Sequence, residues 1–266
     1  MKHVLTIAGS DCSGGAGIQA DLKTFAAHGV YGMSVILSVV AENTTRVIGA
    51  EHISPAMIAD QIQAVFEDIR VDAVKIGMVP SRQAMEILAL ELKRWSPRNI
   101  VLDPVMVAKN GFALMDSQLA QTLVELVFPL ADVVTPNIPE AEILTGMSIT
   151  TLADMEEAAR RIHKYGPRYV LVKGGHRTDD ATDILFDGKQ VLKYTSKRID
   201  TKNTHGTGCT FSSAIAANLA LGKPIDQAVK AAKTYVTMAI EHALPLGNGC
   251  GPTHHFYDLY KNGLPQ

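Results

Sequence analysis

The sequence contains few cysteines and no long apolar run. Its three cysteines, Cys12, Cys209 and Cys250, are odd in number and irregularly spaced, which fits neither a disulfide framework nor a zinc-ligand pattern. No run of about 18 apolar residues occurs, as a membrane-spanning helix would need. The apolar start of the chain turns polar at Ser10, too early for an export signal. We therefore expect a cytoplasmic protein that neither spans a membrane nor is exported.

An excess of charge of either sign is also missing. The chain has 25 Lys and Arg against 27 Asp and Glu, a formal net charge of −2. A protein that binds nucleic acid needs a basic surface to neutralise several phosphates, so we expect no nucleic-acid partner. Hydrophobic residues make up 47% and charged residues 20% of the chain, which is ordinary for a soluble globular protein and excludes a disordered one.

Short β-branched apolar runs alternate with longer amphipathic stretches along the whole chain, which indicates βαβ units around a mostly parallel sheet. The expected strands are residues 4–8, 35–40, 73–76, 100–102, 132–134 and 169–172. The expected helices are residues 17–27, 56–69, 82–94, 117–127, 152–165, 209–221 and 225–242. No linker rich in Pro, Gly and Ser and no repeat divides the chain, so we expect a single domain over residues 1–266.

A hairpin signal follows the last of these strands. Asp187 and Gly188 separate two runs within residues 182–194, and an Asp-Gly pair between alternating runs is a strong hairpin cue. The predicted fold is therefore an α/β, doubly wound, mostly parallel sheet that is flanked by helices and has an antiparallel edge. In such folds, ligands bind at the carboxyl ends of the strands.

Glycines crowd the segment after the first strand, at residues 9–21. A Gly-x-Gly-x-x-Ala match to the dinucleotide-binding fingerprint ends at Ala20. The surrounding sequence does not fit a dinucleotide-binding site, because several residues separate the match from the strand and no acidic residue follows about 20 positions later. We favour a loop whose backbone approaches a small ligand, with Asp11 and Asp21 available to bond it. A plain glycine-rich connection is the alternative.

A second glycine cluster precedes the helix expected from residue 209. Gly206 and Gly208 leave successive N–H groups unpaired at a helix start, and the helix dipole adds to them, so we predict an anion site for a transferring phosphoryl group. The alternative is an ordinary helix start capped by Thr207. Cys209 lies where a helix N-terminus would lower the pKa of a thiol. It is either a base or hydroxyl-positioning group, or a small buried hydrophobe.

Oxygen ligands follow two neighbouring strands. Asp103 comes directly after residues 100–102, and Asn137 and Glu140 follow residues 132–134. Hard oxygens at adjacent strand ends suit a Mg²⁺ that keeps several waters. The alternative for Glu140 is an ordinary acid in the first turn of a helix. Lys173 closes the next strand and is a candidate for holding phosphate or nucleotide.

A series of motifs identifies a family. No Gly-x-x-x-x-Gly-Lys-Ser/Thr sequence occurs, which excludes a Walker-type nucleotide site. What occurs instead, in order, is LTIAGSDCSGGAGIQADLKTF, KIGM, VLDPVM, TPNIPEAE, VKGGH and NTHGTGCTFSSAIAA. This series resembles the hydroxymethylpyrimidine-phosphate kinase family over essentially the full length, from Leu5 to residues 251–255. The resemblance implies a ribokinase-like fold, a homodimer, Mg-ATP as phosphoryl donor, and phosphorylation of a hydroxymethylpyrimidine and then of its monophosphate.

The resemblance also implies roles for individual residues. Gly206, Gly208 and Cys209 resemble the family's anion hole and catalytic cysteine. The positions that resemble its substrate pocket are Ala16, Asp21, Val40, Glu42 and Met78. The expected metal, phosphate and nucleotide contacts are Asp103, Asn137, Glu140, Lys173 and Thr207.

One position departs from the family pattern. The usual Val-Ala-Gln-Asn-Thr reads Val-Ala-Glu-Asn-Thr at residues 40–44, so Glu42 stands where a glutamine amide would bond the pyrimidine ring. A glutamine both donates and accepts hydrogen bonds, whereas an ionised glutamate only accepts. A bond from Glu42 to an acceptor ring nitrogen therefore needs a protonated carboxyl group or a protonated ring.

Three other functions compete with this one. A pyridoxal or pyridoxine kinase of the same superfamily can share the Gly-Thr-Gly-Cys signature, although Asn43-Thr44-Thr45 is closer to the pyrimidine-kinase pattern. A dinucleotide-dependent oxidoreductase would use the loop before Ala20 to hold phosphates. A non-catalytic ligand-binding protein could share the fold. Cofactor binding and phosphoryl transfer from ATP discriminate among them.

Overall fold

The computed structural model describes residues 1–106, 115–175 and 181–263. Its strands are β1 (His3–Asp11), β2 (Tyr31–Glu42), β3 (Val47–His52), β4 (Ala73–Ile76), β5 (Ile100–Leu102), β6 (Val133–Val134), β7 (Tyr169–Val172), β8 (Asp183–Phe186) and β9 (Val191–Tyr194). Its helices are α1 (Gly17–Ala27), α2 (Pro55–Asp68), α3 (Arg82–Trp95), α4 (Ser117–Leu126), α5 (Ile138–Thr145), α6 (Leu152–His163), α7 (Thr207–Ala220), α8 (Ile225–Glu241) and α9 (Tyr257–Asn262), with a 3₁₀ turn, η1 (Phe128–Leu130).

These strands form one continuous sheet in the order β3-β2-β1-β4-β5-β6-β7-β8-β9. The six central strands are parallel: β2, β1, β4, β5, β6 and β7. The outer strands β3, β8 and β9 pair antiparallel with their neighbours. The chain winds outward from β1 to β3 on one side and from β4 to β9 on the other. The strand order thus reverses between β1 and β4, which is where folds of this kind bind their ligands.

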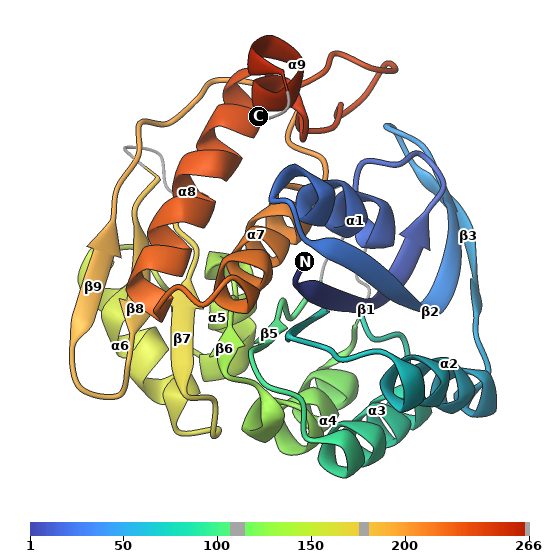
Figure 1. Cartoon of the computed structure of the whole chain (residues 1–266). Coiled ribbons are helices and arrows are strands. Elements are labelled where there is room, and N and C mark those ends of the chain that lie inside the picture. Colours follow the sequence, from blue (N-terminus) through green and yellow to red (C-terminus); the bar gives the residue numbers. More distant parts are fainter. Residues whose placement is uncertain (107–114, 176–180, 264–266) are drawn as a thin grey trace.

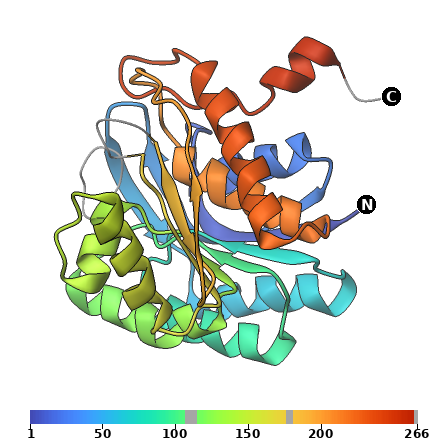
Figure 2. The same ribbon diagram turned by 90° about the vertical axis from the view of Figure 1, so that its left-hand side faces the viewer.

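Helices cover both faces of the sheet (Figures 1 and 2). Successive residues of a strand point to opposite faces, and in β1 Val4 packs with the core under α1, α7 and α8, whereas Leu5 packs with the core under α2 to α6. The neighbouring strand β4 repeats this division with Ala73 and Val74. Strands that are buried on both faces read as continuous apolar runs, which is why the sequence pattern located them.

The six parallel strands and the hairpin expected from the sequence are confirmed, but four short elements were missed: β3, α5, α9 and the 3₁₀ turn η1. Strand β3 adds a second antiparallel edge, and five of its six residues are exposed, so it has no apolar alternation to recognise. Helices α5 and α9 have only eight and six residues, too few for a helical period to stand out. Helix α7 begins at Thr207, two residues before the predicted start.

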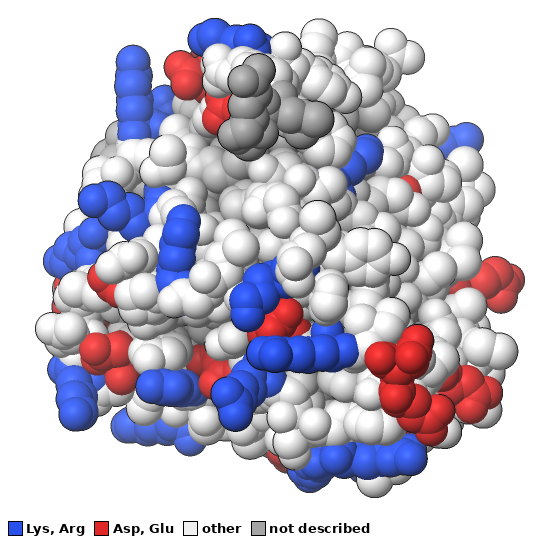
Figure 3. Space-filling model, in the orientation of Figure 1, with Lys and Arg blue, Asp and Glu red and all other residues white. Residues whose placement is uncertain are grey.

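The surface in Figure 3 carries interspersed basic and acidic side chains rather than a continuous basic patch on the face it shows. Within the described ranges, every helix is too short or too polar to cross a membrane.

The segment after α8 folds back onto the start of α7 through His255. This side chain is 5% exposed, and its Nε2 lies 3.0 Å from the Thr210 hydroxyl. Its backbone carbonyl accepts a hydrogen bond from the Tyr235 hydroxyl at 2.8 Å. Burial lowers the pKa of His255 from 6.5 to about 4, because a charged imidazole is poorly solvated there.

We predict that His255 makes the fold sensitive to acid. Between pH 6.5 and about 4 the unfolded chain binds a proton at His255 that the folded chain does not. Lowering the pH across this range therefore lowers the free energy of unfolding by about 3 kcal/mol in total. Urea unfolding of the wild type and of His255→Gln across this range measures the effect. The variant should show a flatter pH dependence, and parallel curves for the two proteins would contradict the prediction.

Candidate active site

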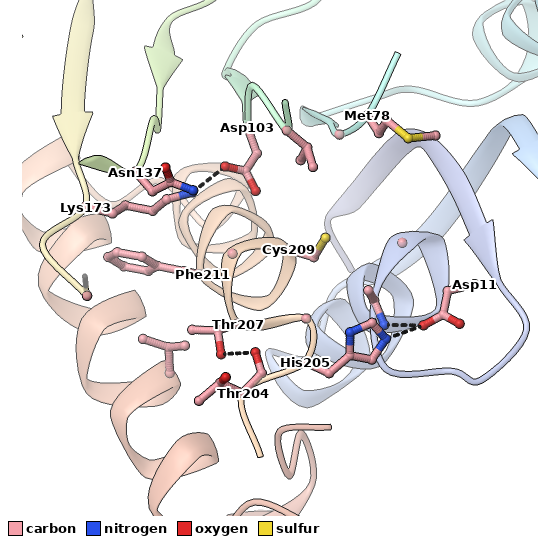
Figure 4. A pocket seen from close by; sticks show the side chains of 18 of the residues that line it. Asp11, Met78, Asp103, Asn137, Lys173, Thr204, His205, Thr207, Cys209 and Phe211 are labelled. Carbon is pink, nitrogen blue, oxygen red and sulfur yellow. Dashed lines mark hydrogen bonds and ion pairs between the residues drawn. The ribbon is translucent and has the colours of Figure 1, made fainter. Parts of the chain in front are cut away.

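A cavity of about 980 Å³ opens at the carboxyl ends of the parallel strands. Residues after β1, β4, β5, β6 and β7 line it, together with the end of β2, strand β3 and the first turn of α7. All of the site residues predicted from the sequence line this cavity except Asp21. Figure 4 shows the sulfur of Cys209 between the Asp103–Lys173 pair and the Asp11–His205 pair.

The first turn of α7 faces the middle of the cavity. Gly206 is the N-cap, with a φ of +75° that glycine adopts without strain. The backbone of Gly15 passes so close that a Cβ on Gly206 would lie 1.8 Å from the Gly15 carbonyl oxygen. Thr207 is therefore not the cap, and its hydroxyl instead donates to the Thr204 carbonyl at 2.8 Å.

Two amides of this turn remain available to a ligand. The Thr207 N–H donates to the Thr204 carbonyl, but within the described residues no acceptor is recorded for the N–H groups of Gly208 and Cys209. A Cβ on Gly208 would lie 3.1 Å from Asp103 Oδ2 and 3.5 Å from Lys173 Nζ. The helix N-terminus and a buried lysine thus converge on one place, which is the arrangement expected of an anion site.

Asp103 and Lys173 form a buried ion pair. Lys173 Nζ lies 2.5 Å from Asp103 Oδ1, and the Thr135 hydroxyl donates to the same oxygen at 3.0 Å. Burial alone would lower the pKa of Lys173, but the nearby carboxylates of Asp103 and Glu140 raise it above its ordinary value. Lys173 therefore stays a cation next to the two available amides.

Asn137 and Glu140 make a capping box at the start of α5. Asn137 Oδ1 accepts the Glu140 N–H at 2.9 Å, and Glu140 Oε2 accepts the Asn137 N–H at 2.8 Å. Glu140 is 3% exposed, and burial, together with the charge of Asp103, raises its pKa to about 7 against the opposing effect of Lys173. Glu140 is thus the first-turn acid that we gave as the alternative, but it also lines the cavity beside Asp103.

The thiol of Cys209 is not activated by the helix terminus as predicted. Burial and the carboxylates of Asp21 and Asp103 raise its pKa to about 11, although the Lys75 ammonium and a hydrogen bond from the Gly17 N–H oppose them. The sequence revealed the helix terminus but not the loss of solvent around the thiol or the two nearby acids. At neutral pH Cys209 is a thiol.

Asp21 does not line the cavity, unlike the other predicted site residues, so its predicted role toward a substrate stays a prediction. It is fully buried and accepts hydrogen bonds from Thr6 at 2.6 Å and from Ser213 at 2.7 Å. Lys75 borders the cavity, and its Nζ lies 2.8 Å from Asp21 Oδ2. Sequence reasoning missed Lys75, because a single lysine inside the apolar strand β4 carries no signal of its own.

The remaining predicted residues line the end of the cavity near β1 and β2. Ala16, Val40, Glu42 and Met78 lie there. His205 was missed: its Nε2 lies 2.9 Å from Asp11 Oδ2, 194 residues away in sequence.

The other end of the cavity lies between α7 and α8. Phe211 of α7 and Val236 and Ile240 of α8 line it, as does part of residues 196–201. A further buried pair borders this end, because Lys233 Nζ lies 2.7 Å from Asp183 Oδ2. Asp183 Oδ1 in turn accepts the Gly174 N–H at 2.8 Å, which fixes the loop after Lys173.

Comparisons with known proteins identify relatives of this fold and site. A family model described as phosphomethylpyrimidine kinase matches residues 11–254. The chain is 46% identical over 258 residues to the hydroxymethylpyrimidine/phosphomethylpyrimidine kinase of Bacillus subtilis, covering 96% of this chain and 95% of that protein. It is 54% identical over 253 residues to a thiamine biosynthesis bifunctional protein of Geobacter sulfurreducens, but these cover 95% of this chain and only 52% of that protein.

Solved structures agree with this assignment. An ADP complex of Bacillus subtilis pyridoxal kinase superposes with a TM-score of 0.91 and 44% identity, covering 96% of this chain and 98% of that one. A phosphomethylpyrimidine kinase from Clostridium difficile superposes with a TM-score of 0.82 and 46% identity, covering 90% of this chain and 100% of that one. The fold is ribokinase-like, and the chain belongs to the phosphomethylpyrimidine kinase family.

Proposed function

We propose that the protein transfers the terminal phosphoryl group of ATP to the hydroxymethyl group of 4-amino-5-hydroxymethyl-2-methylpyrimidine, and then phosphorylates the monophosphate to the diphosphate, in thiamine biosynthesis. The observation that carries the proposal is the pair of available amides at Gly208 and Cys209, which face Lys173 in the middle of one large cavity. This arrangement suits a group that passes between two ligands bound end to end.

The two ends of the cavity suit two different ligands. The end near Ala16, Val40 and Met78 is where we place the pyrimidine, with the hydroxymethyl group directed toward Cys209. We place the adenine between Phe211 and α8, because apolar walls suit a flat base. The phosphates then reach the first turn of α7, where unpaired N–H groups and the helix dipole favour negative charge.

Phosphoryl transfer depends mainly on positioning and on stabilising charge, because its transition state is loose. The N–H groups of Gly208 and Cys209 and the ammonium of Lys173 are fixed before the ligands arrive. They therefore act on the developing charge without reorganising, which is the condition for strong electrostatic catalysis. Cys209, as a neutral thiol, orients the attacking hydroxyl rather than deprotonating it.

The residues also suit a Mg²⁺ ion. Asp103 and Glu140 are buried carboxyl groups that line the same part of the cavity. Burial and the charge of Asp103 raise the pKa of Glu140 even though Lys173 lies nearby, so a second cation beside the two carboxyl groups would be favoured. Because Glu140 already accepts the Asn137 N–H, we expect it to reach the ion through bound water, as Mg²⁺ commonly allows. The ion would neutralise phosphate charge during transfer.

We further propose that the protein works in the cytoplasm as a single-domain homodimer. The outer edge of β3 is unpaired within the described residues. On the same hairpin Val39 is 48% exposed and Ile48 is 68% exposed, so a second copy would bury apolar surface there. Size-exclusion chromatography with light scattering measures the mass in solution and tests the dimer.

The activity is tested by following ATP consumption in parallel with the pyrimidine alcohol, its monophosphate and pyridoxal. Pyridoxal is included because the solved relatives include a pyridoxal kinase. We expect turnover with the first two substrates to exceed turnover with pyridoxal. A higher kcat/KM for pyridoxal would instead make the protein a pyridoxal kinase.

We predict that Gly208→Ala lowers kcat by roughly 10²- to 10³-fold, as loss of one donor to developing charge typically does. The added methyl group would point at Asp103 and Lys173 and displace the transferring group from the amides. The KM for the alcohol should change little, because the alcohol binds elsewhere in the cavity. A correctly folded variant with wild-type kcat would refute the anion site.

We also predict that Cys209→Ala loses activity by less than the roughly 10²- to 10⁴-fold expected for a general base, with little effect on ATP affinity. Cys209→Asp should retain part of the rate, because a carboxylate can also orient the hydroxyl. The matched control is Cys250→Ala, since Cys250 does not line the cavity.

The pH profile of kcat distinguishes an orienting thiol from a thiolate base. With a thiol pKa of about 11, the wild type should show no thiol-dependent rise in kcat between neutral pH and about pH 9. A rise in that range that disappears in Cys209→Ala would mean that Cys209 acts as a thiolate.

A further inference from the structure

The hairpin formed by β2 and β3 makes a wall of the cavity, but its outer strand has little support. The β3 residues that line the cavity are Val47, Ile48, Gly49, Ala50 and His52. In the described sheet β3 pairs with β2 alone, and five of its six residues are exposed. A strand that is supported along one edge needs a further contact to keep its place in the wall.

That contact is made by the turn between the two strands, residues 43–46. The turn is stiff in itself, because Asn43 Oδ1 accepts the N–H groups of Thr45 and Arg46 at 2.9 and 3.0 Å, as asparagine commonly does in tight turns. Residues 43–46 do not line the cavity. The turn therefore affects a bound ligand through the segments that it holds and not by touching the ligand.

A glycine-rich strap, which we define as residues 247–253, packs against this turn. It belongs to the segment after α8 and lies beside the tip of the hairpin (Figure 1). The Cys250 N–H donates to the Thr44 carbonyl at 2.9 Å, and the Gly249 N–H donates to the Thr44 hydroxyl at 3.1 Å. The fit is close, because a Cβ on Gly249 would lie 2.0 Å from the Thr44 carbonyl oxygen.

The strap is also hydrogen-bonded to the loop before α7. The Gly251 N–H donates to Asn203 Oδ1 at 3.1 Å, and the His205 N–H donates to the Gly251 carbonyl at 3.0 Å. The Thr253 N–H donates to the His205 carbonyl at 3.4 Å. His205 directly precedes Gly206, the N-cap of the anion-binding turn. The strap therefore joins the tip of the hairpin to the start of the anion site.

Two walls of the cavity are thus connected by a segment that lies outside it. The hydroxymethyl group that we place near the hairpin must meet the phosphoryl group held by the amides of Gly208 and Cys209. Phosphoryl transfer depends mainly on positioning, and a displacement of about 1 Å can lower a rate by roughly 10²-fold. A fixed separation between the two walls is therefore a requirement of the reaction.

We infer that Thr44 is a positioning residue for phosphoryl transfer, because through the strap it holds the hairpin wall at a fixed distance from the anion-binding turn. The inference rests on the proposed function, which assigns the alcohol to the hairpin end of the cavity. With the wall in place, the substrate hydroxyl meets the phosphoryl group and water is excluded. When the wall moves away, water takes the phosphoryl group, and ATP gives ADP and inorganic phosphate instead of ADP and the phosphorylated alcohol.

Thr44→Val tests the inference, because it removes the hydroxyl and keeps the volume of the side chain. The Gly249 N–H then loses its acceptor, a change that corresponds to a factor of roughly three to ten. The kcat/KM for the alcohol should fall by this factor, and the ratio of phosphate released to alcohol phosphorylated should rise by it. The KM for ATP should stay near the wild-type value, because Asp11 still holds His205. Both products are measured in the same reaction.

Three further variants separate positioning from stability. Thr44→Ser keeps the hydroxyl and should retain the wild-type ratio. Gly249→Ala pushes the strap away from the Thr44 carbonyl and should have the larger effect, up to roughly 10²-fold in kcat/KM. Thr234→Val is the matched control and should behave as wild type, because its exposed hydroxyl donates within α8 and does not line the cavity. Urea unfolding and light scattering record the stability and the mass of each variant.

Failure of the inference and failure of the proposed function give different results. If Thr44→Val and Gly249→Ala are less stable to urea but keep the wild-type ratio and kcat/KM, the strap serves stability alone; the inference is then wrong and the function stands. If Thr44→Ser loses as much as Thr44→Val, the hydroxyl does not position the wall and the inference is again wrong. This comparison decides even if Gly249→Ala does not fold. A wild type that phosphorylates neither the alcohol nor its monophosphate refutes both.

Discussion

The carboxylate of Asp11 binds together the two glycine-rich loops from which the site is built. It gathers three N–H groups of its own loop and the ring of His205 from the loop before α7. That cross-link leaves the backbones of Gly15 and Gly206 in direct contact, with no room for a Cβ between them. The first turn of α7 is thereby fixed at the carboxyl edge of the sheet, and the positions of the Gly208 and Cys209 amides follow from it.

Buried Asp–Lys pairs recur around the cavity. Asp21 pairs with Lys75, Asp103 with Lys173 and Asp183 with Lys233. A buried ion pair is weak support for stability, because taking both charges out of water offsets most of their attraction. Their positions are more informative, because each lysine lines a cavity that we propose holds a triphosphate and a phosphorylated product. The aspartates fix these cations and offset their positive charge.

The sequence predicted the parts of the fold that depend on burial and the parts of the site that depend on glycine. Runs such as residues 73–76 are apolar because both faces of the strand are covered, and the glycines at 206 and 208 mark a helix start that approaches other backbone. Strand β3 escaped prediction because it is paired on one side and largely exposed. The pairing of Asp11 with His205 was not predicted, because the residues around each of them give no information about a partner 194 positions away.

Electrostatics were the least predictable property, and Cys209 and Asp21 show why. The sequence correctly indicated a helix terminus at Cys209, which by itself would lower the pKa of the thiol. The same thiol is partly buried and lies near two carboxylates that come from α1 and from the end of β5, and these effects are larger. Lys75, which pairs with Asp21, limits the rise. Asp21 therefore influences the pKa of Cys209 without lining the cavity, an effect that the sequence motif around Asp21 does not reveal.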